Sequence, residues 1–345
     1  MILKKFIKNN SIYLISDVHA NLDLFKECIK DLDLNKEYLF ILGDIIEKGD
    51  QNIDILDYVI DIMKSGHVFY ILGNCDNVLR EFKRPCNKER LNKYSRVLKK
   101  TILNEFYEGI GANYLIDPFD IDSALDLINI KYKKYFDFVL NLPTSIVIND
   151  KVLLTHCDFS EAIKKNLVDN DEIDKVKNYP FKVCGHLPIP LFFDNCDKVS
   201  LSPLIKDGFL YIDGGNNVTP FGGLNLVKLN ISDLSYSFKT FYSYKQIKVI
   251  NNQEESKGLY KAIKTKIDSY TLSNNLVKVN VLDNLYYGDI KGLSRDHKYI
   301  WDITNIFLKL EKEDFVYLVS RGEDVSLIIK DNMLGLAYNI NLDLK

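Results

Sequence analysis

The stretch SIYLISDVHAN, residues 11–21, joins a short apolar run to a loop that carries Asp17 and His19. Five later stretches repeat this arrangement. The apolar runs at residues 38–42, 68–72, 152–154, 181–184 and 209–212 lead into GDIIEKGD, GNCDN, THCD, GHLP and DGGNN, respectively. Short apolar runs bounded by polar and small residues are typical of buried strands. We therefore predict a sheet whose strands end in polar loops.

Helical patterns lie between the first of these strands. Apolar residues recur at helical spacing over residues 22–32 and again over residues 53–63, where aspartates occupy the opposite face. Strands that alternate with helices favour an α/β sheet covered by helices. In such sheets ligands bind beyond the carboxyl ends of the strands, which is where the polar loops fall.

The composition excludes several classes of protein. Of the 345 residues, 46% are hydrophobic and 27% are charged, which excludes a long disordered chain. The net charge of −3 offers no general attraction to nucleic acid, so no extended nucleic-acid binding is expected. The six cysteines form no CxxC pair and the apolar runs are too short for a membrane span. We therefore expect a cytoplasmic protein with reduced thiols and no membrane partner.

Two regions depart from the repeated pattern. Residues 80–135 are mostly helical in pattern and are predicted to form an insertion. After residue 250, the polar run NNQEES is typical of a linker; helical patterns at residues 259–267 and 301–310 and strand patterns at FVYLV, SLII and LGLAYNI follow it. We predict a main domain over residues 1–250 and a small α+β appendage of unknown role over residues 251–345.

The strand-end loops carry three of the five histidines of the chain. Together they supply Asp17, His19, Asp44, Asn74, His156 and His186. These oxygen and imidazole donors suit a site for manganese, iron or zinc. They do not suit a structural zinc site, which would have cysteine ligands. A carboxylate shared by two ligand sets would bridge ions about 3.5–4 Å apart, as in enzymes of in-line displacement at phosphorus. The residues alone therefore suggest a dinuclear hydrolase.

The order of these motifs resembles the calcineurin-like metallophosphoesterase superfamily over about residues 11–230. The motifs are D-x-H (Asp17, His19), G-D (Gly43, Asp44), G-N-x-D (Gly73, Asn74, Asp76), a lone histidine after a strand (His156) and G-H (Gly185, His186). The layout is most similar to the branch of serine/threonine phosphoprotein phosphatases and symmetrical dinucleoside tetraphosphatases, because GDIIEKGDQNIDIL resembles its GDxVDRGPxSxExL. The resemblance implies that residues 1–250 form a catalytic domain with a two-layer β-sandwich flanked by helices.

The resemblance also implies two divalent metal ions, manganese first, with iron, zinc, nickel or cobalt as alternatives. By position, Asp17, His19 and Asp44 would bind the first ion and Asp44, Asn74, His156 and His186 the second, with Asp44 bridging. A hydroxide bridging the ions would attack phosphorus in line, and the ions would neutralise the phosphoryl oxygens. The catalytic residues would be Asp44, Asn74, Cys75 and His156.

Three positions depart from the family pattern. Cys75 stands where that branch has the histidine that protonates the leaving group, and Glu47 stands where it has the aspartate that orients this histidine. Lys48 replaces an arginine that clamps phosphate. A thiol with a pKa near 8.5 is a poor substitute for an imidazolium donor, so the site should favour leaving groups that depart without protonation. Cys75 as a mere packing residue is an equally weighted alternative.

The stretch from Arg80 to Lys100 holds nine basic and two acidic residues, a local charge of +7. It is either a solvated helix face or a funnel for a polyanionic substrate. In the second case Lys48, Arg80 and Arg84 would bind substrate.

These features predict a metal-dependent hydrolase of phosphoesters or phosphoanhydrides. The expected substrates are nucleotide-like or polyphosphorylated small molecules. One alternative is a serine/threonine protein phosphatase with phosphoprotein substrates. An alternative of another class is a catalytically impaired phosphate-binding or scaffold module, since the general acid and the arginine clamps are missing.

Overall fold

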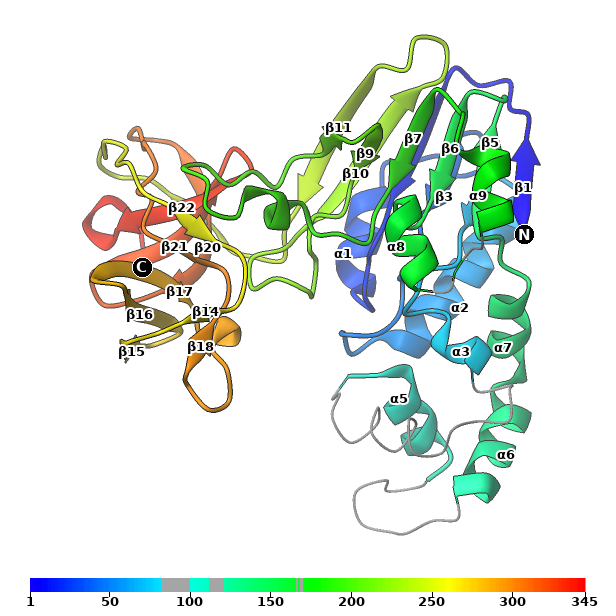
Figure 1. Ribbon diagram of the computed structural model, residues 1–345, viewed down its shortest axis with the longest axis horizontal. Coiled ribbons are helices and arrows are strands. Elements are labelled where there is room, and N and C mark those ends of the chain that lie inside the picture. The colour runs from blue at the N-terminus through cyan, green and yellow to red at the C-terminus, as the bar shows by residue number, and fades with distance from the viewer. Residues whose placement is uncertain (82–99, 112–120, 166, 168–169, 345) are drawn as a thin grey trace. The chain divides into compact units, whose positions relative to one another are not determined.

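The computed structural model describes residues 1–81, 100–111, 121–165, 167 and 170–344 (Figure 1). The chain divides into two compact units. The first unit comprises Met1–Leu187, Leu204–Asp213 and Leu224–Phe241, and the second comprises Pro188–Pro203, Gly214–Gly223 and Tyr242–Lys345.

The first unit contains two mixed sheets (Figure 1). The order of the five-stranded sheet is β11 (Tyr236–Phe241), β10 (Leu224–Asn230), β2 (Ser11–Ile15), β3 (Leu39–Ile41) and β4 (Val68–Tyr70). The order of the six-stranded sheet is β1 (Ile2–Lys5), β5 (Ser145–Ile148), β6 (Val152–Thr155), β7 (Phe181–Cys184), β9 (Phe209–Tyr211) and β8 (Leu204–Lys206). Strands β2, β3 and β4 are parallel, as are β6, β7 and β9. The carboxyl ends of three strands therefore meet at one edge of each sheet.

The two sheets pack face to face through a shared apolar core. Side chains alternate between the faces of a strand, so Ile12 and Leu14 point to one side of β2 and Ile15 to the other. Ile12 and Leu14 belong to a buried cluster that also contains Leu154 and Val183 of the second sheet. The first three predicted apolar runs therefore form strands of one sheet of the sandwich, and the later three form strands of the other.

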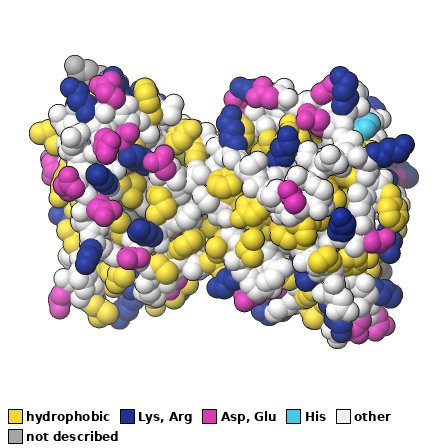
Figure 2. Space-filling model, turned by 90° about the horizontal axis from the view of Figure 1, so that it is seen from above, with side chains coloured by type: hydrophobic (Ala, Val, Ile, Leu, Met, Phe, Trp, Pro, Cys, Tyr) yellow, Lys and Arg dark blue, Asp and Glu magenta, His cyan; other side chains and the backbone are white. Residues whose placement is uncertain are grey.

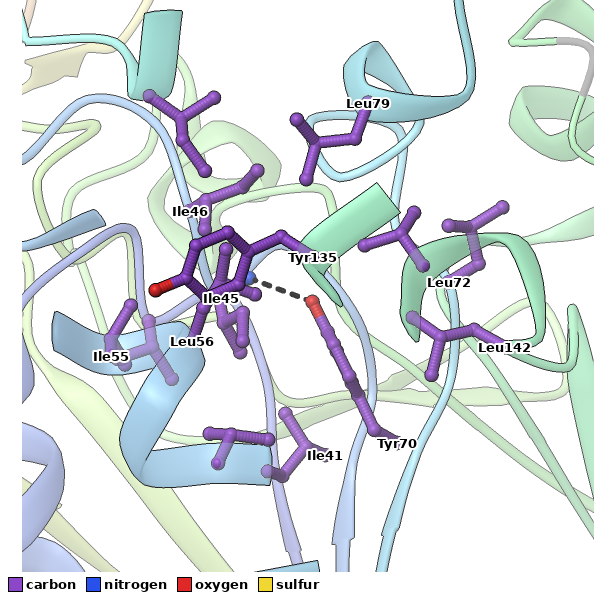
Figure 3. Packing of buried hydrophobic residues seen from close by; sticks show 14 of the residues in the cluster. Ile41, Ile45, Ile46, Ile55, Leu56, Tyr70, Leu72, Leu79, Tyr135 and Leu142 are labelled. Carbon is purple, nitrogen blue, oxygen red and sulfur yellow. Dashed lines mark hydrogen bonds between the residues drawn. The ribbon is translucent and has the colours of Figure 1, made fainter. Parts of the chain in front are cut away.

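Helices cover the outer face of the five-stranded sheet. They are α1 (Leu22–Ile29), α2 (Asn52–Ile62), α3 (Val78–Glu81), α5 (Ile102–Gly109), α6 (Ile121–Lys131) and α7 (Lys133–Leu140), and the 3₁₀ turn η1 (Met63–Ser65) extends α2. Figure 3 shows Ile41 and Tyr70 of the sheet packed with Leu56 of α2 and Tyr135 of α7. The described residues of the predicted insertion are thus helical; residues 82–99 and 112–120 lie outside the described part.

Two further helices, α8 (Phe159–Lys164) and α9 (Asn170–Val176), follow strands of the six-stranded sheet. Phe159 and Val176 pack with Val147 and Leu153 on the face of this sheet that points away from the sandwich core. The layers are therefore helix, sheet, sheet and helix. This confirms the predicted two-layer sandwich flanked by helices.

The second unit is built from strands and 3₁₀ turns over its described residues. One sheet has the order β12 (Gln246–Lys248), β20 (Phe315–Arg321), β21 (Val325–Lys330) and β22 (Met333–Tyr338). The other has the order β13 (Tyr260–Lys261), β19 (Ile303–Thr304), β17 (Asn284–Asp289), β16 (Leu276–Val281) and β15 (Ser269–Ser273). A two-stranded ladder pairs β14 (Thr265–Lys266) with β18 (Tyr299–Ile300), and the 3₁₀ turns are η2 (Ile189–Phe193), η3 (Ile290–Gly292) and η4 (Asn339–Asn341).

The helices predicted at residues 259–267 and 301–310 are wrong. Residues 259–267 contain the strands β13 and β14, and Ile263, which an apolar helical stripe would bury, is 58% exposed. In the second segment Asp302 has a φ of 56°, which interrupts a right-handed helix before β19. Both segments pair with strands about 35 to 45 residues away in sequence, as Tyr260 does with Thr304. The predicted strands at FVYLV, SLII and LGLAYNI are confirmed as β20, β21 and β22.

Figure 2 shows one face of the molecule, on which basic and acidic side chains are interspersed and neither sign forms a continuous field. This agrees with the near balance of 45 Lys+Arg against 48 Asp+Glu. Among the described residues, no helix has the length and apolar character needed to cross a membrane.

Candidate metal centre

The six predicted ligands all follow strands of the first unit. Asp17 and His19 follow β2, Asp44 follows β3 and Asn74 follows β4, whereas His156 and His186 follow β6 and β7 of the other sheet. Ligand atoms of His19, Asp44 and Cys75 lie within 4.8 Å of one another, and so do those of Asp44, His156 and His186. Asp44 is common to both groups. The loops of the two sheets therefore converge on one carboxylate.

Asp17 and Asn74 complete these two groups. The Nε2 atom of His19 lies 3.8 Å from Oδ1 of Asp17, and the Nε2 atom of His156 lies 3.1 Å from Oδ1 of Asn74. The backbone N–H of His186 donates to Oδ2 of Asp17 (2.9 Å), which joins the β2 loop to the β7 loop. All six predicted ligands thus lie in one cluster around Asp44.

Backbone carbonyls fix the orientation of two histidine rings. The Nδ1 atom of His156 lies 2.8 Å from the carbonyl of Leu42, and that of His19 lies 3.3 Å from the carbonyl of Ile46. A carbonyl only accepts hydrogen bonds, so each Nδ1 carries a proton, and in the neutral ring Nε2 then presents a lone pair. Metal-binding histidines are commonly held in this way.

The donor set around His156 fits a cation. In the neutral ring, the lone pair of Nε2 faces Oδ1 of Asn74 at 3.1 Å and Oδ1 of Asp44 at 3.5 Å. Three electron-rich atoms converge here, and all three are buried or partly buried. Such an arrangement is repulsive unless a positive charge lies among the atoms. A divalent ion with nitrogen and oxygen ligands satisfies this requirement.

The backbone is strained at four of the six ligands. The φ angles of Asp17, His19, Asp44 and His186 are 53°, 48°, 53° and 68°. This left-handed conformation is rare for residues other than glycine, although aspartate and histidine adopt it more readily than most. Each such residue costs on the order of 1–3 kcal/mol, and such strain clusters at functional sites. The strained backbone thus lies in the same loops as the predicted ligands.

The glycine before a ligand allows two loops to approach the cluster closely. A Cβ atom at Gly73 would lie 2.1 Å from Oδ1 of Asp44, and one at Gly185 would lie 2.1 Å from Oδ2 of Asp17. Neither position has room for a side chain. The glycines of the G-N and G-H motifs are therefore steric requirements of the site.

Burial keeps the histidines uncharged. It lowers the pKa of His19 to about 3, an effect that Lys48 reinforces, and it lowers the pKa of His186 to about 4 together with the nearby His156. Both rings are thus neutral near pH 7 and able to ligate a metal. Although burial opposes it, the basic neighbours of Asp44, the ammonium group of Lys48 among them, hold the pKa of Asp44 well below its usual range.

Asp76 accepts hydrogen bonds from the backbone of the two loops that carry Asp44 and Asn74. Its Oδ2 accepts hydrogen bonds from the backbone N–H groups of Gly73 and Asp44, both at 2.8 Å, and its Oδ1 accepts one from Ile45 at 3.2 Å. Figure 3 shows the hydroxyl of Tyr70 directed at the same Ile45 N–H, 3.4 Å away. Burial, aided by the charge of Asp44, raises the pKa of Asp76 to about 6. The prediction that Asp76 supports the metal loop is confirmed.

Cys75 and Lys48 border the cluster. The backbone N–H of Cys75 donates to Oδ1 of Asp44 (2.8 Å), and burial raises the pKa of the Cys75 thiol, which keeps it protonated. The Nζ of Lys48 lies 3.2 Å from Nε2 of His19. The structure thus brings one thiol and one ammonium group to the predicted ligands.

Other residues singled out in the sequence have different partners. Arg80 donates from Nη2 to the carbonyl of Leu142 (3.0 Å) and from Nε to that of Val139 (3.3 Å), so its guanidinium binds the C-terminal end of α7. We therefore assign Arg80 to this helix end and not to substrate. Oε1 of Glu47 accepts the N–H of Ile102 at the start of α5 (3.0 Å). Arg84, and the basic stretch apart from its ends, lie outside the described residues.

Glu161 is a site residue that sequence reasoning missed. It lies in the first turn of α8, and its Oε2 is 3.6 Å from Nε2 of His186. Its other carboxylate oxygen pairs with Lys164 (2.6 Å). The sequence offered one signal, namely that Glu161 comes five residues after His156 at the start of a helix.

A family model described as calcineurin-like phosphoesterase matches residues 11–227. Similar solved structures include a metallophosphoesterase from Sphaerobacter thermophilus, with 15% identity, 67% of this chain and 87% of that chain covered, and a TM-score of 0.36. A protein serine/threonine phosphatase from Saccharomyces cerevisiae has 13% identity, 71% and 84% coverage, and a TM-score of 0.41. A cold-active protein-tyrosine phosphatase from a psychrophilic Shewanella species has 16% identity, 69% and 81% coverage, and a TM-score of 0.39. No curated protein matches the chain significantly.

The structural neighbours have TM-scores below 0.5, so the assignment rests on the family model. That model covers well over half of the 345 residues and includes every residue of the cluster around Asp44. The chain belongs to the calcineurin-like phosphoesterase family of metal-dependent phosphoester hydrolases.

Proposed function

We propose that this metallophosphoesterase uses two divalent ions to hydrolyse nucleotide-like or polyphosphorylated small molecules. The observation that carries the choice of substrate is the thiol of Cys75 beside Asp44, at the position where the family resemblance expects a histidine. A thiol has an ordinary pKa of about 8.5, about two units above that of an imidazolium, and so gives up its proton less readily. It is therefore a weak acid for a leaving alkoxide.

The two groups that share Asp44 support two ions. Asp17, His19 and Asp44 would hold one, and Asp44, Asn74, His156 and His186 the other, with manganese as the first candidate. When bound, the ions would activate water as the nucleophile and neutralise phosphoryl charge. The chain itself fixes the ligand atoms, since carbonyls hold His19 and His156 and Asp76 holds the Asp44 loop.

Lys48 is the proposed substrate-binding residue. Its Nζ lies at the metal cluster, 3.2 Å from His19 Nε2, where it would meet an oxygen of the substrate phosphate. An ammonium group contributes a point charge, whereas an arginine would clamp two phosphate oxygens. A polyphosphate, which offers many oxygens, depends less on such a clamp than a monoester does.

The position that the resemblance assigns to the general acid is occupied by Cys75, which supplies no imidazolium. Glu47, in the place of the orienting aspartate, binds the N-terminus of α5 instead. A leaving phosphate or nucleotide is a far weaker base than serine alkoxide and departs without a proton donor. The site is therefore suited to phosphoanhydrides and activated esters.

A substrate panel tests this proposal. The manganese-loaded protein is assayed with ATP, a dinucleoside tetraphosphate, bis-p-nitrophenyl phosphate and a phosphoserine peptide. We expect kcat/KM for the anhydrides to exceed that for the peptide by at least tenfold. A preference for the peptide would establish the protein-phosphatase alternative, and no turnover of any substrate by metal-loaded protein would establish a binding or scaffold role.

The substitution Cys75→His tests the reason for the preference. It should raise the hydrolysis of alkyl monoesters more than that of anhydrides, because only the alkoxide needs a proton. Cys28→Ser, in a buried cysteine of α1, serves as the control for cysteine replacement. Equal effects of Cys75→His on both substrate types would contradict the leaving-group argument.

A further inference from the structure

The second unit contains a hollow of about 400 Å³ that is lined by three lysines. Lys261 ends β13, Lys264 precedes β14 and Lys266 ends β14. The lining also includes Asn195 and Leu282. The volume lies within the range of about 300–1,000 Å³ that is usual for small-molecule sites. All of these residues belong to the second unit, whereas the metal cluster lies in the first.

The lysines of this hollow are not neutralised by carboxylates. Among the described residues, none of the three forms an ion pair; Lys261 instead donates to Oδ1 of Asn195 (3.0 Å). Two aspartates also line the hollow, but backbone groups occupy them. Oδ1 of Asp194 accepts the N–H of Ala262 (2.8 Å), and Oδ2 of Asp268 accepts the N–H of Leu282 (2.8 Å). The lining therefore carries three ammonium groups against two carboxylates, and this surplus of positive charge favours an anion.

Apolar side chains border the same hollow. Ile263 is 58% exposed and Leu282 is 80% exposed, and both belong to the lining. Single exposed apolar residues are common on protein surfaces. Here they line the same hollow as the lysines, so one ligand could pair its charges with the lysines and cover the apolar groups with its body.

Two aromatic rings lie close to the ammonium group of Lys264. The Nζ of Lys264 lies 3.9 Å from the ring centre of Tyr299 and 6.0 Å from that of Trp301. Cation–π contacts stabilise the charged form of the lysine. Trp301 is the single tryptophan of the chain, so its fluorescence reports on this region alone.

We propose that this hollow is a second ligand site, which binds a phosphate-bearing small molecule with an apolar or aromatic body, such as a nucleoside triphosphate. Lys264 and Lys266 would pair with the phosphates, and Ile263 and Leu282 would contact the base. The proposal stands on the residues of the second unit and does not depend on the chemistry of the metal centre.

A fluorescence titration of the full-length, metal-loaded protein tests the site. Trp301 is excited at the red edge of its absorption while a non-hydrolysable ATP analogue is added. We expect a saturable change that weakens as salt is raised, because exposed ion pairs are screened. Lys266→Gln leaves the contact of Lys264 with the rings intact and should raise the apparent Kd about fivefold. The exposed Lys278 lies outside the lining, so Lys278→Gln should leave the titration unchanged.

Calorimetry with the same analogue provides a readout independent of the tryptophan. We expect a binding event in the parent protein that Lys264→Gln/Lys266→Gln weakens at least tenfold while phosphatase activity stays unchanged, whether or not the analogue also binds at the metal centre. The proposal is overturned if no binding event occurs, or if the double substitution alters none of the events that do. Binding to anionic lipid vesicles without binding of the analogue would also overturn it, since the shared phosphate chemistry would then serve a membrane surface.

Discussion

Replacing Asp76 by asparagine should loosen the metal loops without removing any metal ligand. The carboxylate accepts three backbone N–H groups, from Gly73, Asp44 and Ile45. Asparagine keeps one acceptor oxygen, which can serve Gly73 and Asp44. Its amide N–H₂ then faces the N–H of Ile45, so one hydrogen bond is lost and two lose their charge assistance.

The magnitude follows from these three bonds. A hydrogen bond to a charged group contributes roughly 1.5–3 kcal/mol and a neutral one roughly 0.5–1.5 kcal/mol. One lost bond and two weakened bonds give a gross cost of about 3–5 kcal/mol, from which relief of the buried charge subtracts about 1 kcal/mol. Burial raises the pKa of Asp76, which shows that its charge is costly. The expected net cost is about 2–4 kcal/mol of local stability.

Hydrogen exchange measures this cost where it arises. Exchange in peptides that cover residues 43–46 and 73–77 should accelerate at least 30-fold, since about 1.4 kcal/mol corresponds to a factor of ten. The exposed Asp61, which pairs with Lys64, provides the control, and Asp61→Asn should leave these peptides unchanged. Unaltered exchange in Asp76→Asn, with unaltered manganese stoichiometry, would refute the supporting role of Asp76.

Three further substitutions probe the cluster. Asp44→Asn should abolish turnover of every substrate and reduce bound manganese measured by elemental analysis; full activity would show that Asp44 is not shared by the ions. Gly185→Ala should lower kcat/KM at least tenfold and lower the melting temperature, because its Cβ would lie 2.1 Å from Asp17 Oδ2; a fully active variant would contradict the close approach. Glu161→Gln should weaken metal binding several-fold in calorimetry while leaving the fold intact by circular dichroism, as expected for a side chain that orients His186; unchanged affinity would remove Glu161 from the site.

The sequence predicted the ligand cluster because its information is local. Asp17, Asp44 and Asn74 each lie within four residues of the end of an apolar strand, and parallel strands bring such ends to the same edge of a sheet. His156 and His186 follow the same rule in the second sheet. The order of the motifs therefore allowed both the layers of the first unit and the residues of its site to be predicted.

The sequence did not predict the hydrogen-bond partners of residues whose partners lie far away along the chain. The partners of Arg80 are carbonyls about 60 residues away, at the end of α7, and Glu47 meets the start of α5 about 55 residues away. Neither partner is marked by a motif. Basic residues near the metal loops were therefore predicted to bind substrate, although the guanidinium of Arg80 hydrogen-bonds to carbonyls at the end of α7.

The strands of the second unit were missed for a related reason. Each of β13, β14, β18 and β19 is two residues long, too short to show an alternating pattern. Their existence depends on pairing such as Thr265 with Ile300, across more than 30 residues. The longer strands β20, β21 and β22 were predicted, whereas β15, β16 and β17, which have five or six residues each, were not.

The connectivity of the two units has a consequence for how the chain can be cut or rearranged. The second unit takes residues 188–203 and 214–223 from between strands of the first, so the backbone passes from one unit to the other five times. Val199 and Phe221 of these excursions belong to the same apolar core as Leu334 and Leu336 near the C-terminus. A chain truncated after residue 241 would keep both excursions and lose the core that buries them. The second unit is thus not a detachable module, and exchanging it between relatives would require replacing three segments at five junctions, one of them within two residues of His186.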